Sequence, residues 1–266
     1  MNRIHKSLKV AVVASVALTV LGLAGSCGKK EDKQLDTKSL ADNRYVNWKV
    51  VQFQNIKILY PESHPQESTF TEMGQAYIYL QRKLQEILGF PAITDTITVY
   101  YYTGYGQGRE LTTQEYPFAD STTIHFWLPS FYGPPMMQYL LPRWAPDPPK
   151  NKFLKHGLIS LFDLSGQKYH ESTIGYINGK SFIPLDSLVR DTSTNSNLER
   201  YQSGEAASFC AFIIGQYGPQ ALKDLYICPQ PFDVCVRQTL MTSVDTLQSL
   251  WLGFVRMNVP KDSLRN

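Results

Sequence analysis

The sequence predicts an α+β fold, because strand-like and helix-like segments occupy different halves of the chain. Segments in which apolar and polar residues alternate fall between residues 46 and 128, with one helical segment among them. After residue 131 the apolar residues recur at helical spacing instead. The 266 residues, 43% of them hydrophobic, are enough to bury one well-packed core or two small ones.

Residues 1–26 are expected to be a signal peptide and not part of the fold. Three basic residues within the first nine precede the apolar run Val10–Leu23, which is too short to span a membrane comfortably. Small residues follow this run and lead directly to Cys27. The arrangement resembles the lipobox of bacterial lipoproteins, in which the cysteine becomes the acylated N-terminus, although Ala24 stands where leucine is usual.

The lipobox resemblance implies a protein of the bacterial cell envelope. It would be anchored to the membrane through lipidated Cys27, at the periplasmic face or the outer surface. The alternatives are an uncleaved membrane anchor and an ordinary secretory signal. The lipoprotein interpretation is favoured because residues 27–44 are hydrophilic and have the composition of a flexible, solvated tether.

The charge of the mature chain argues against nucleic acid as a partner. Loss of residues 1–26 removes three of the 26 basic residues and leaves 23, which equals the number of acidic residues. A neutral chain without a basic stripe lacks the electrostatic attraction on which binding to phosphate backbones depends.

The folded domain is expected at residues 45–256, followed by a C-terminal tail at residues 257–266. Within the domain, a sheet-rich part covers residues 45–130 and a helical part covers residues 131–256. The division follows from where the period of the apolar pattern changes from two residues to about 3.6.

Three segments of the sheet-rich part have the composition and alternation of strands. Residues 46–60 hold two strand-like runs, and residues 96–102 and 122–128 hold one each. The strongest helix of the chain lies between the first two segments. Thr69 and Glu72 have the spacing of a capping box, which predicts that this helix opens at Thr69.

Residues 103–120 form a glycine-rich loop in this part. Its glycines at positions 104, 106 and 108 invite comparison with phosphate-binding loops, but the spacing is not G-x-G-x-x-G and no Lys-Ser or Lys-Thr pair follows. Tight turns, or a mobile lip beside a groove, explain the glycines better.

The helical part has apolar residues at helical spacing in six segments. A proline-rich linker at residues 145–149 separates the first two segments. A long excursion at residues 165–197, with a turn at Asn178-Gly179, separates the second from the third. The six segments are residues 134–141, 153–162, 199–218, 219–227, 232–241 and 242–255.

Four stretches of the helical part resemble, in the same order, the peptidase-MA-like group of gluzincin metallopeptidases. Phe153–Phe162, FLKHGLISLF, resembles the family helix W-L-x-E-G-L-A-x-Y-F, and Ser181–Val189 resembles the element I-P-L-x-x-L. Tyr201–Gly218 resembles a family helix that ends in Y-G, and Ser243–Trp251 resembles the final S-x-x-x-L-x-x-x-W helix. The shared order carries the resemblance more than any single motif.

The resemblance implies a gluzincin, or zincin-like, architecture, in which a small N-terminal mixed sheet packs on the helical half. Active members bind zinc through an H-E-x-x-H helix, whose Glu is the general base, and through a Glu from a second helix. Here the motif positions fall at Pro134, Pro135 and Gln138, and His156 replaces the third ligand. No His or Glu occurs in residues 126–155, so we expect neither catalytic residues nor a metal cofactor.

The alternative is an active zinc metallohydrolase that uses non-standard ligands. Such a site needs at least three protein ligands and a base. The candidates in the mature chain are His64, His125, His156 and His170, with Glu171 beside the last. Nucleophilic catalysis has less support, because no G-x-S-x-G occurs and Cys210 lies among apolar helix residues.

We therefore expect a membrane-anchored lipoprotein whose inactive zinc-peptidase-like domain is a binding or interaction module in the cell envelope. Its partner would be a peptide, a glycan or an envelope protein. The residues expected to line a groove are Trp127, Tyr132, Tyr139, Trp144, His125 and His156. The alternatives are that the aromatic side chains fill the space of the lost metal site, and that the protein has a purely structural role.

Cys228 and Cys235 flank PQPFDV, a short connection between two predicted helices. An oxidising compartment permits disulfides, so we expect these two residues to form a local disulfide. Cys210 would then remain buried and unpaired.

Overall fold

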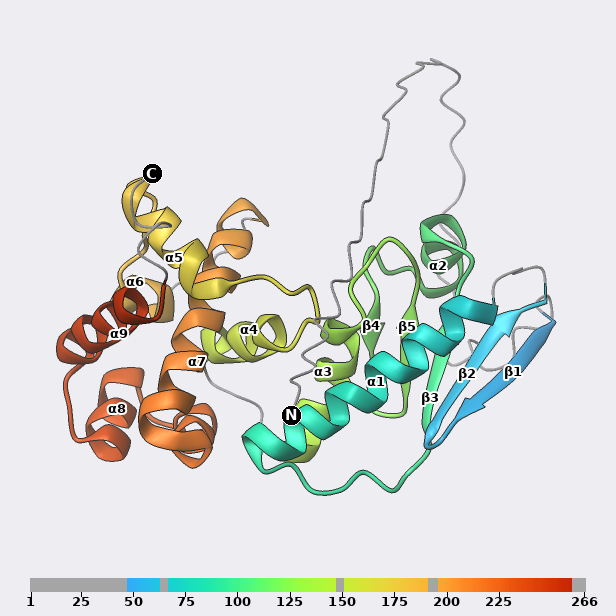
Figure 1. The fold of residues 1–266 in the computed structure, drawn as a ribbon, viewed down its shortest axis with the longest axis horizontal. Helices are drawn as coiled ribbons and strands as arrows, with labels where there is room; N and C mark the ends of the chain where they lie inside the picture. Colours follow the sequence, from blue (N-terminus) through green and yellow to red (C-terminus); the bar gives the residue numbers. More distant parts are fainter. Residues whose placement is uncertain (1–46, 63–66, 147–150, 191–195, 260–266) are drawn as a thin grey trace, which may run out of the picture. The chain divides into compact units, whose positions relative to one another are not determined.

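The structure of the protein is a computed structural model that describes residues 47–62, 67–146, 151–190 and 196–259 (Figure 1). The expected signal peptide and tether, together with Cys27, lie outside the described residues, as does His64.

Five strands form one mixed sheet in the N-terminal part of the domain, and the rest of the described chain is mostly helical. The order across the sheet is β1-β2-β3-β5-β4; β2, β3 and β5 are parallel, and β1 and β4 pair antiparallel at the two edges. The predicted α+β class and the mixed sheet are confirmed. The strands are β1 (Trp48–Phe53), β2 (Ile56–Pro61), β3 (Ile97–Tyr101), β4 (Phe118–Ala119) and β5 (Thr123–Phe126).

The helices among the described residues are α1 (Glu67–Leu88), α2 (Tyr105–Thr112), α3 (Gly133–Trp144), α4 (Lys152–Leu161), α5 (Tyr169–Asn178), α6 (Leu185–Arg190), α7 (Ser196–Ile227), α8 (Phe232–Leu240) and α9 (Val244–Asn258). None of these helices is both long and apolar enough to cross a membrane. All the described residues belong to one compact unit.

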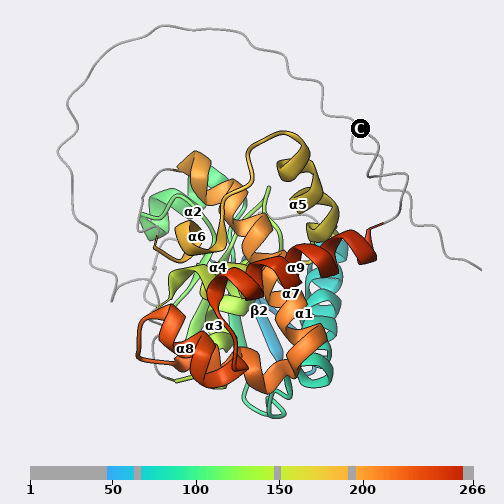
Figure 2. The ribbon, with the colours of Figure 1, turned by 90° about the vertical axis from the view of Figure 1, so that its left-hand side faces the viewer.

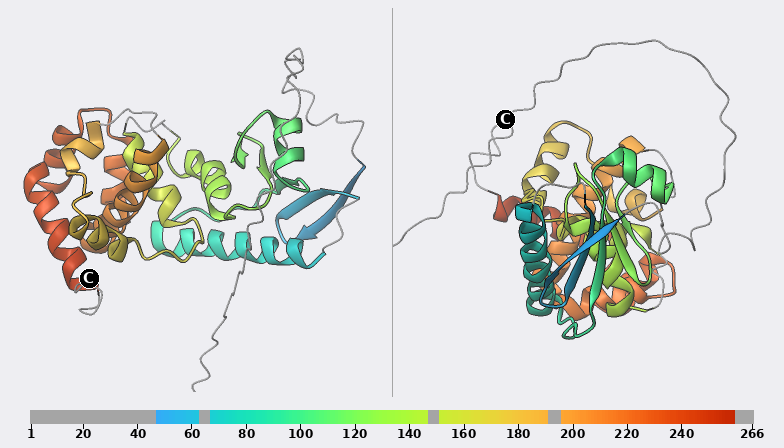
Figure 3. Two further views of the ribbon diagram at one scale, coloured as in Figure 1. Left: turned by 90° about the horizontal axis from the view of Figure 1, so that it is seen from above. Right: turned by 90° about the vertical axis from the view of Figure 1, so that its right-hand side faces the viewer.

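The helix α1 runs along one face of the sheet (Figure 3). Phe70 on α1 stacks on Tyr60 of β2, with 4.2 Å between ring centroids, and meets Tyr101 of β3 edge-on at 5.1 Å. Gly74 leaves room for the ring of Phe53, since a Cβ at this position would lie 2.6 Å from it. Aromatic contacts therefore fix α1 on the apolar face of the sheet.

The opposite face of the sheet is covered in part by its own aromatic side chains. Tyr100, His125 and Phe118 are cross-strand neighbours on β3, β5 and β4. Their rings stack, with 5.5 Å between the centroids of Tyr100 and His125 and 4.6 Å between those of His125 and Phe118. Trp48 of β1 meets Tyr100 edge-on at 5.3 Å. Because each ring covers the face of the next, His125 is only 3% exposed.

Two local predictions are wrong. The first helix begins at Glu67 and not at Thr69, because nothing in Glu67-Ser68 is unfavourable enough to break a helix. The glycines of the loop expected at residues 103–120 do not make a succession of tight turns, since Gly106 and Gly108 lie in α2 and Gly104 is its N-cap. Gly108 of α2 packs so closely on Trp127 that a Cβ would lie 2.5 Å from the indole, so this glycine serves close packing.

The helical part is built on the packing of α4 against α7 (Figure 2). Gly157 of α4 allows this approach, because a Cβ there would lie 2.5 Å from the carbonyl oxygen of Ala206 and 2.7 Å from Sγ of Cys210. The N-terminus of α3 is equally close to the end of α4. The N–H of Gly133 donates to the carbonyl of Asp163 at 3.2 Å, and a side chain at position 133 would overlap that backbone.

The long helix α7 is interrupted at Gly218, whose φ of 84° and ψ of 167° are not helical. The helices expected at residues 199–218 and 219–227 are therefore the two segments of α7. Cys228 and Cys235, the pair expected from their spacing, form a disulfide, and Cys210 is buried without a disulfide partner. The excursion expected at residues 165–197 contains two helices, α5 and α6.

Candidate functional site

The residues that the sequence comparison placed at the positions of the zinc motif are Pro134, Pro135, Gln138 and His156, and the structure does not bring them together as a set of metal ligands. Pro134 and Pro135 lie in the first turn of α3, next to the backbone of Asp163. His156 is exposed on α4, seven residues before Asp163, which corresponds to about 10 Å along a helix axis. Gln138 accepts a hydrogen bond of 3.1 Å from the N–H of Ala119 and so links α3 to the edge strand β4. Among the described residues, no group of three or more His, Cys, Asp or Glu side chains is placed to hold a metal ion.

Both ring nitrogens of buried His125 are occupied. Nδ1 lies 2.8 Å from the hydroxyl of Tyr102, and Nε2 lies 3.0 Å from the hydroxyl of Thr123. Burial lowers the pKa of His125, and the carboxylate of Asp120, 3.6 Å from Nε2, opposes that shift only in part. The structure thus holds His125 as a neutral, hydrogen-bonded residue of the sheet.

His170 and Ser208 have the atoms of a base and a nucleophile, but they do not form an accessible pair. Nδ1 of His170 lies 2.8 Å from Oγ of Ser208, and Nε1–H of Trp251 donates to the same oxygen at 3.1 Å. Burial lowers the pKa of His170. Ser208 is completely buried, so the network links α5, α7 and α9 and cannot reach a substrate.

The residues expected to line a groove are mostly in the interior. His125, Trp127, Tyr139 and Trp144 are buried, Tyr132 is half-buried, and His156 is exposed. The indole N–H of Trp144 donates to the carbonyl of Leu88 at 3.2 Å, and the indole ring stacks on the ring of Phe90. None of the six lines either of the two hollows described below.

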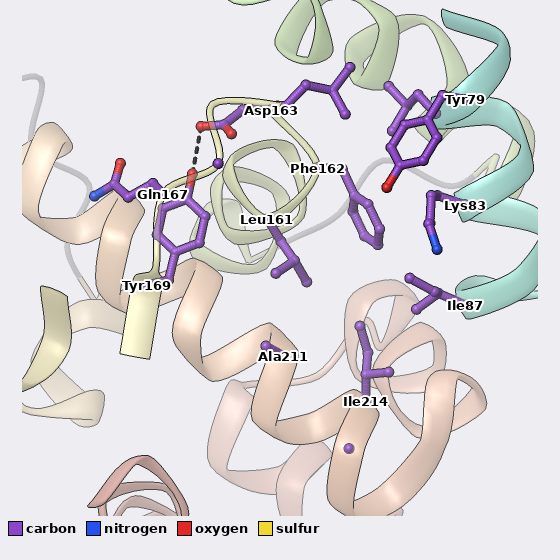
Figure 4. A pocket seen from close by; sticks show the side chains of 14 residues that line it. Tyr79, Lys83, Ile87, Leu161, Phe162, Asp163, Gln167, Tyr169, Ala211 and Ile214 are labelled. Carbon is purple, nitrogen blue, oxygen red and sulfur yellow. Dashed lines mark hydrogen bonds between the residues drawn. The ribbon is translucent and has the colours of Figure 1, made fainter. Parts of the chain in front are cut away.

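A hollow of about 560 Å³ lies instead between α1, the segment that follows α4, and α7 (Figure 4). This volume is within the range of small-molecule sites. We call it the apolar hollow; its lining comes from Tyr79, Leu80, Lys83 and Ile87 of α1, from Leu161, Phe162, Asp163, Leu164, Gly166, Gln167 and Tyr169, and from Ala211, Ile214 and Gly215 of α7.

Most of this lining is hydrocarbon, and the hollow opens to solvent. Leu161, Ala211 and Ile214 face it from the two helices of the helical part (Figure 4). The side chain of Tyr79, on the opposite side, is 51% exposed. Lys83 is the one cation of the described lining. Its amine lies 3.3 Å from the carboxylate of Glu86 and 5.7 Å from the ring centroid of Tyr79.

At the polar end of the apolar hollow, hydrogen bonds hold the side chains of Tyr169 and Asp163 in place. The hydroxyl of Tyr169 lies 2.5 Å from Oδ2 of Asp163 and 2.6 Å from the carbonyl oxygen of Ser160. Oδ1 of Asp163 accepts the N–H of Ser165 at 2.8 Å. Burial and the hydrogen bond to Asp163 raise the pKa of Tyr169, so its hydroxyl keeps its proton and remains a donor at neutral pH.

Two other reactive groups lie apart from the hollow. Burial raises the pKa of the Cys210 thiol, so this cysteine is not an activated nucleophile. Glu205 is fully buried, and one of its oxygens accepts the N–H of Ile183 at 3.2 Å. Burial raises the pKa of Glu205 to about 8, although that hydrogen bond acts in the opposite direction, so the carboxyl is mostly protonated at neutral pH.

Sequence reasoning did not select the residues of the apolar hollow, because they come from three distant segments. One local signal was present. The run Leu161-Phe162-Asp163-Leu164 continues the apolar pattern beyond the last residue of α4. Apolar residues just after a helix end are unusual for an exposed loop and indicate contact with another element.

Comparison with known protein families and with curated proteins found no match to this chain.

Proposed function

We propose that the protein is a lipoprotein of the bacterial cell envelope, anchored through Cys27, whose folded domain binds a ligand without transforming it. The apolar part of that ligand occupies the apolar hollow. The observation that carries this function is a solvent-open hollow of about 560 Å³ with a mainly hydrocarbon lining. Burial of an apolar group there supplies binding free energy in proportion to the area removed from water.

The proposal that the domain does not catalyse a reaction rests on where the reactive side chains lie. The described lining of the apolar hollow contains no histidine, cysteine or serine. His125 has both nitrogens engaged, and the hydroxyl of Ser208 is enclosed. An acid-base or nucleophilic mechanism needs a reactive group that is available to the ligand. The lining does contain Asp163, Tyr169 and Lys83, but Asp163 and Tyr169 are hydrogen-bonded to each other and Lys83 lies beside Glu86.

The zinc-peptidase-like scaffold remains part of the proposal. It is supported by the succession of a mixed sheet, the paired helices α3 and α4, and the bond from Gln138 to the neighbouring edge strand. The alternative, a zinc hydrolase with non-standard ligands, would require His156 and other ligands to converge.

The binding function is tested by filling the apolar hollow. The experiment uses a soluble form that begins after Cys27 and keeps the compact unit whole. Ala211→Phe places a ring in the hollow, and Gln216→Phe places the same ring at an exposed position of the same helix. Titration with the neutral dye Nile red should saturate for the unmodified protein and for Gln216→Phe.

We expect Ala211→Phe to weaken dye binding at least tenfold, because the ring occupies the volume that the dye needs. Melting temperatures of both variants check that the fold is intact. Equal dye affinity in the two variants, or no saturable binding by the unmodified protein, would overturn the proposed function.

A further inference from the structure

A second hollow, of about 490 Å³, adjoins the apolar hollow. Asp163, Gln167 and Tyr169 line both hollows, which meet at these side chains. We call it the polar hollow; its other lining residues are Ser160, Tyr176, Ser203 and Gly204. The two adjoining hollows thus differ in lining, since one is lined mainly by hydrocarbon and the other by hydroxyl, amide, carboxylate and phenol groups.

The polar hollow is suited to a neutral ligand group. Its described lining has no Lys, Arg or His, so none of these described side chains compensates a negative charge. Its single carboxylate, Asp163, already accepts hydrogen bonds from Ser165 and Tyr169. Hydroxyl and amide side chains both donate and accept hydrogen bonds, which matches alcohols and amides and not a charged group.

The size of the polar hollow depends on a glycine. A Cβ at Gly204 would lie 3.1 Å from the hydroxyl oxygen of Tyr176, so a side chain there would press on the phenol that lines the hollow. The rings of Tyr169 and Tyr176 add flat apolar surface beside the polar groups. Flat rings next to hydrogen-bonding side chains suit a sugar-like group, which has apolar C–H faces and a polar rim.

Building on the proposed function, we infer that the two hollows form one site for a neutral amphiphile. The apolar chain lies in the apolar hollow, and a polyhydroxylated head lies in the polar hollow. In the described lining of the two hollows, the cation that would favour an anionic head is Lys83, which is on α1, across the apolar hollow from Asp163 and Gln167 (Figure 4). Its amine is already close to the carboxylate of Glu86.

The test compares three ligands that share one chain: octanol below its solubility limit, and octyl glucoside and octyl sulfate below their micelle concentrations. Displacement of Nile red from the soluble form gives their affinities. We expect octyl glucoside to bind about tenfold more tightly than octanol, because a few net hydrogen bonds are gained in the polar hollow. Octyl sulfate should bind no better than octanol.

A variant tests whether the polar hollow is responsible for the higher affinity for octyl glucoside. Ser203→Leu fills the polar hollow from α7, and Ser249→Leu, at an exposed position of α9, is the matched control. Ser203→Leu should reduce the affinity for octyl glucoside to that for octanol and leave octanol unchanged. Retained octanol binding also shows that the variant is folded.

Each outcome has a distinct meaning. If octyl glucoside and octanol bind the unmodified protein equally, the polar hollow is not a subsite, although the proposed function stands. If octyl sulfate binds most tightly and Lys83→Met abolishes its advantage, the head is anionic and the inference is wrong. If none of the three displaces the dye, the proposed function itself fails.

Discussion

The phenol of Tyr102 lies 2.8 Å from Nδ1 of His125, and its neighbours fix the direction of that hydrogen bond. The hydroxyl of Thr123 donates to Oδ2 of Asp120 at 2.9 Å, so its oxygen is left to accept Nε2–H of His125. Nδ1 therefore carries no proton and accepts from Tyr102. A single chain of donors runs from the phenol through the imidazole to the carboxylate.

This chain predicts that protonation of His125 weakens the fold as the pH falls below about 6.5. Burial lowers the pKa of His125 in the folded state, whereas the unfolded chain titrates near the ordinary value of about 6.5. As the pH falls, the unfolded state binds the proton first. The stabilising effect is thus complete above about pH 6.5 and is lost as the pH falls through the lower folded value.

The measurement is the urea midpoint at pH 7.5 and pH 5.5. The change from pH 7.5 to pH 5.5 should be less destabilising in His125→Phe than in the unmodified protein, while the loss of a partner for the buried phenol of Tyr102 costs about 1–3 kcal/mol at both pH values. Other pH dependence should remain, because burial lowers the pKa of His170 as well and raises that of Glu205 to about 8. The Glu205 contribution has the opposite sign, since a raised pKa stabilises the fold as the pH falls. The exposed residue His156 provides the control, His156→Phe. Equal pH dependence in all three proteins would contradict the assignment.

Two glycine substitutions should have opposite effects on stability. Gly157→Ala should lower the free energy of unfolding by about 1–2 kcal/mol, because the new methyl group meets the carbonyl of Ala206 at 2.5 Å and the gain in helix propensity only partly offsets this overlap. At Gly253 in α9 an added Cβ would have no neighbour within 4 Å, so Gly253→Ala should raise the free energy of unfolding by about 0.5–1 kcal/mol. Urea unfolding measures both; stabilisation by Gly157→Ala would show that α4 and α7 are not so close.

The lipoprotein proposal predicts that Cys27→Ala releases the protein from the membrane fraction or stops its processing. Stable anchoring takes two acyl chains or more, and the cysteine is their attachment point. Cell fractionation and the mass of the membrane-bound form provide the measurement, with Cys210→Ala as the control for loss of a thiol. An unchanged membrane fraction in Cys27→Ala would count against a lipid anchor.

The soluble form should contain no stoichiometric zinc and should cleave no peptide. A chelator should leave its melting temperature unchanged, because metal contributes no folding free energy. His156→Ala should have no effect on metal content. Elemental analysis that returns close to one zinc ion per chain, removed by His156→Ala, would support the alternative hydrolase.

The fold could be predicted from the sequence where one local pattern dominates. The alternation of apolar residues in residues 96–102 and 122–128 is sufficient to identify β3 and β5, because each strand buries one face, β3 against α1 and β5 against α3. The segment that forms α2 has a composition typical of turns, and its helix depends on the contact between Gly108 and Trp127. No local pattern reports such a contact.

The candidate site was less predictable for a related reason. Aromatic residue type suggested Trp127 and Trp144 as groove residues, but type does not distinguish a ring that binds a ligand from one that fills the core. The apolar hollow arises where α1, the end of α4 and α7 meet. Its existence depends on tertiary packing, for which the run after Leu161 is only a partial signal.

The bond between Gln138 and Ala119 also affects how the sheet meets other molecules. An incoming strand adds to a sheet by pairing with free N–H and C=O groups along an edge. At the β4 edge the strand is only two residues long, and the N–H of Ala119 is already taken by the glutamine. Strand addition and edge-to-edge aggregation are thus disfavoured on this side, so a peptide that docks by extending the sheet would be directed to β1.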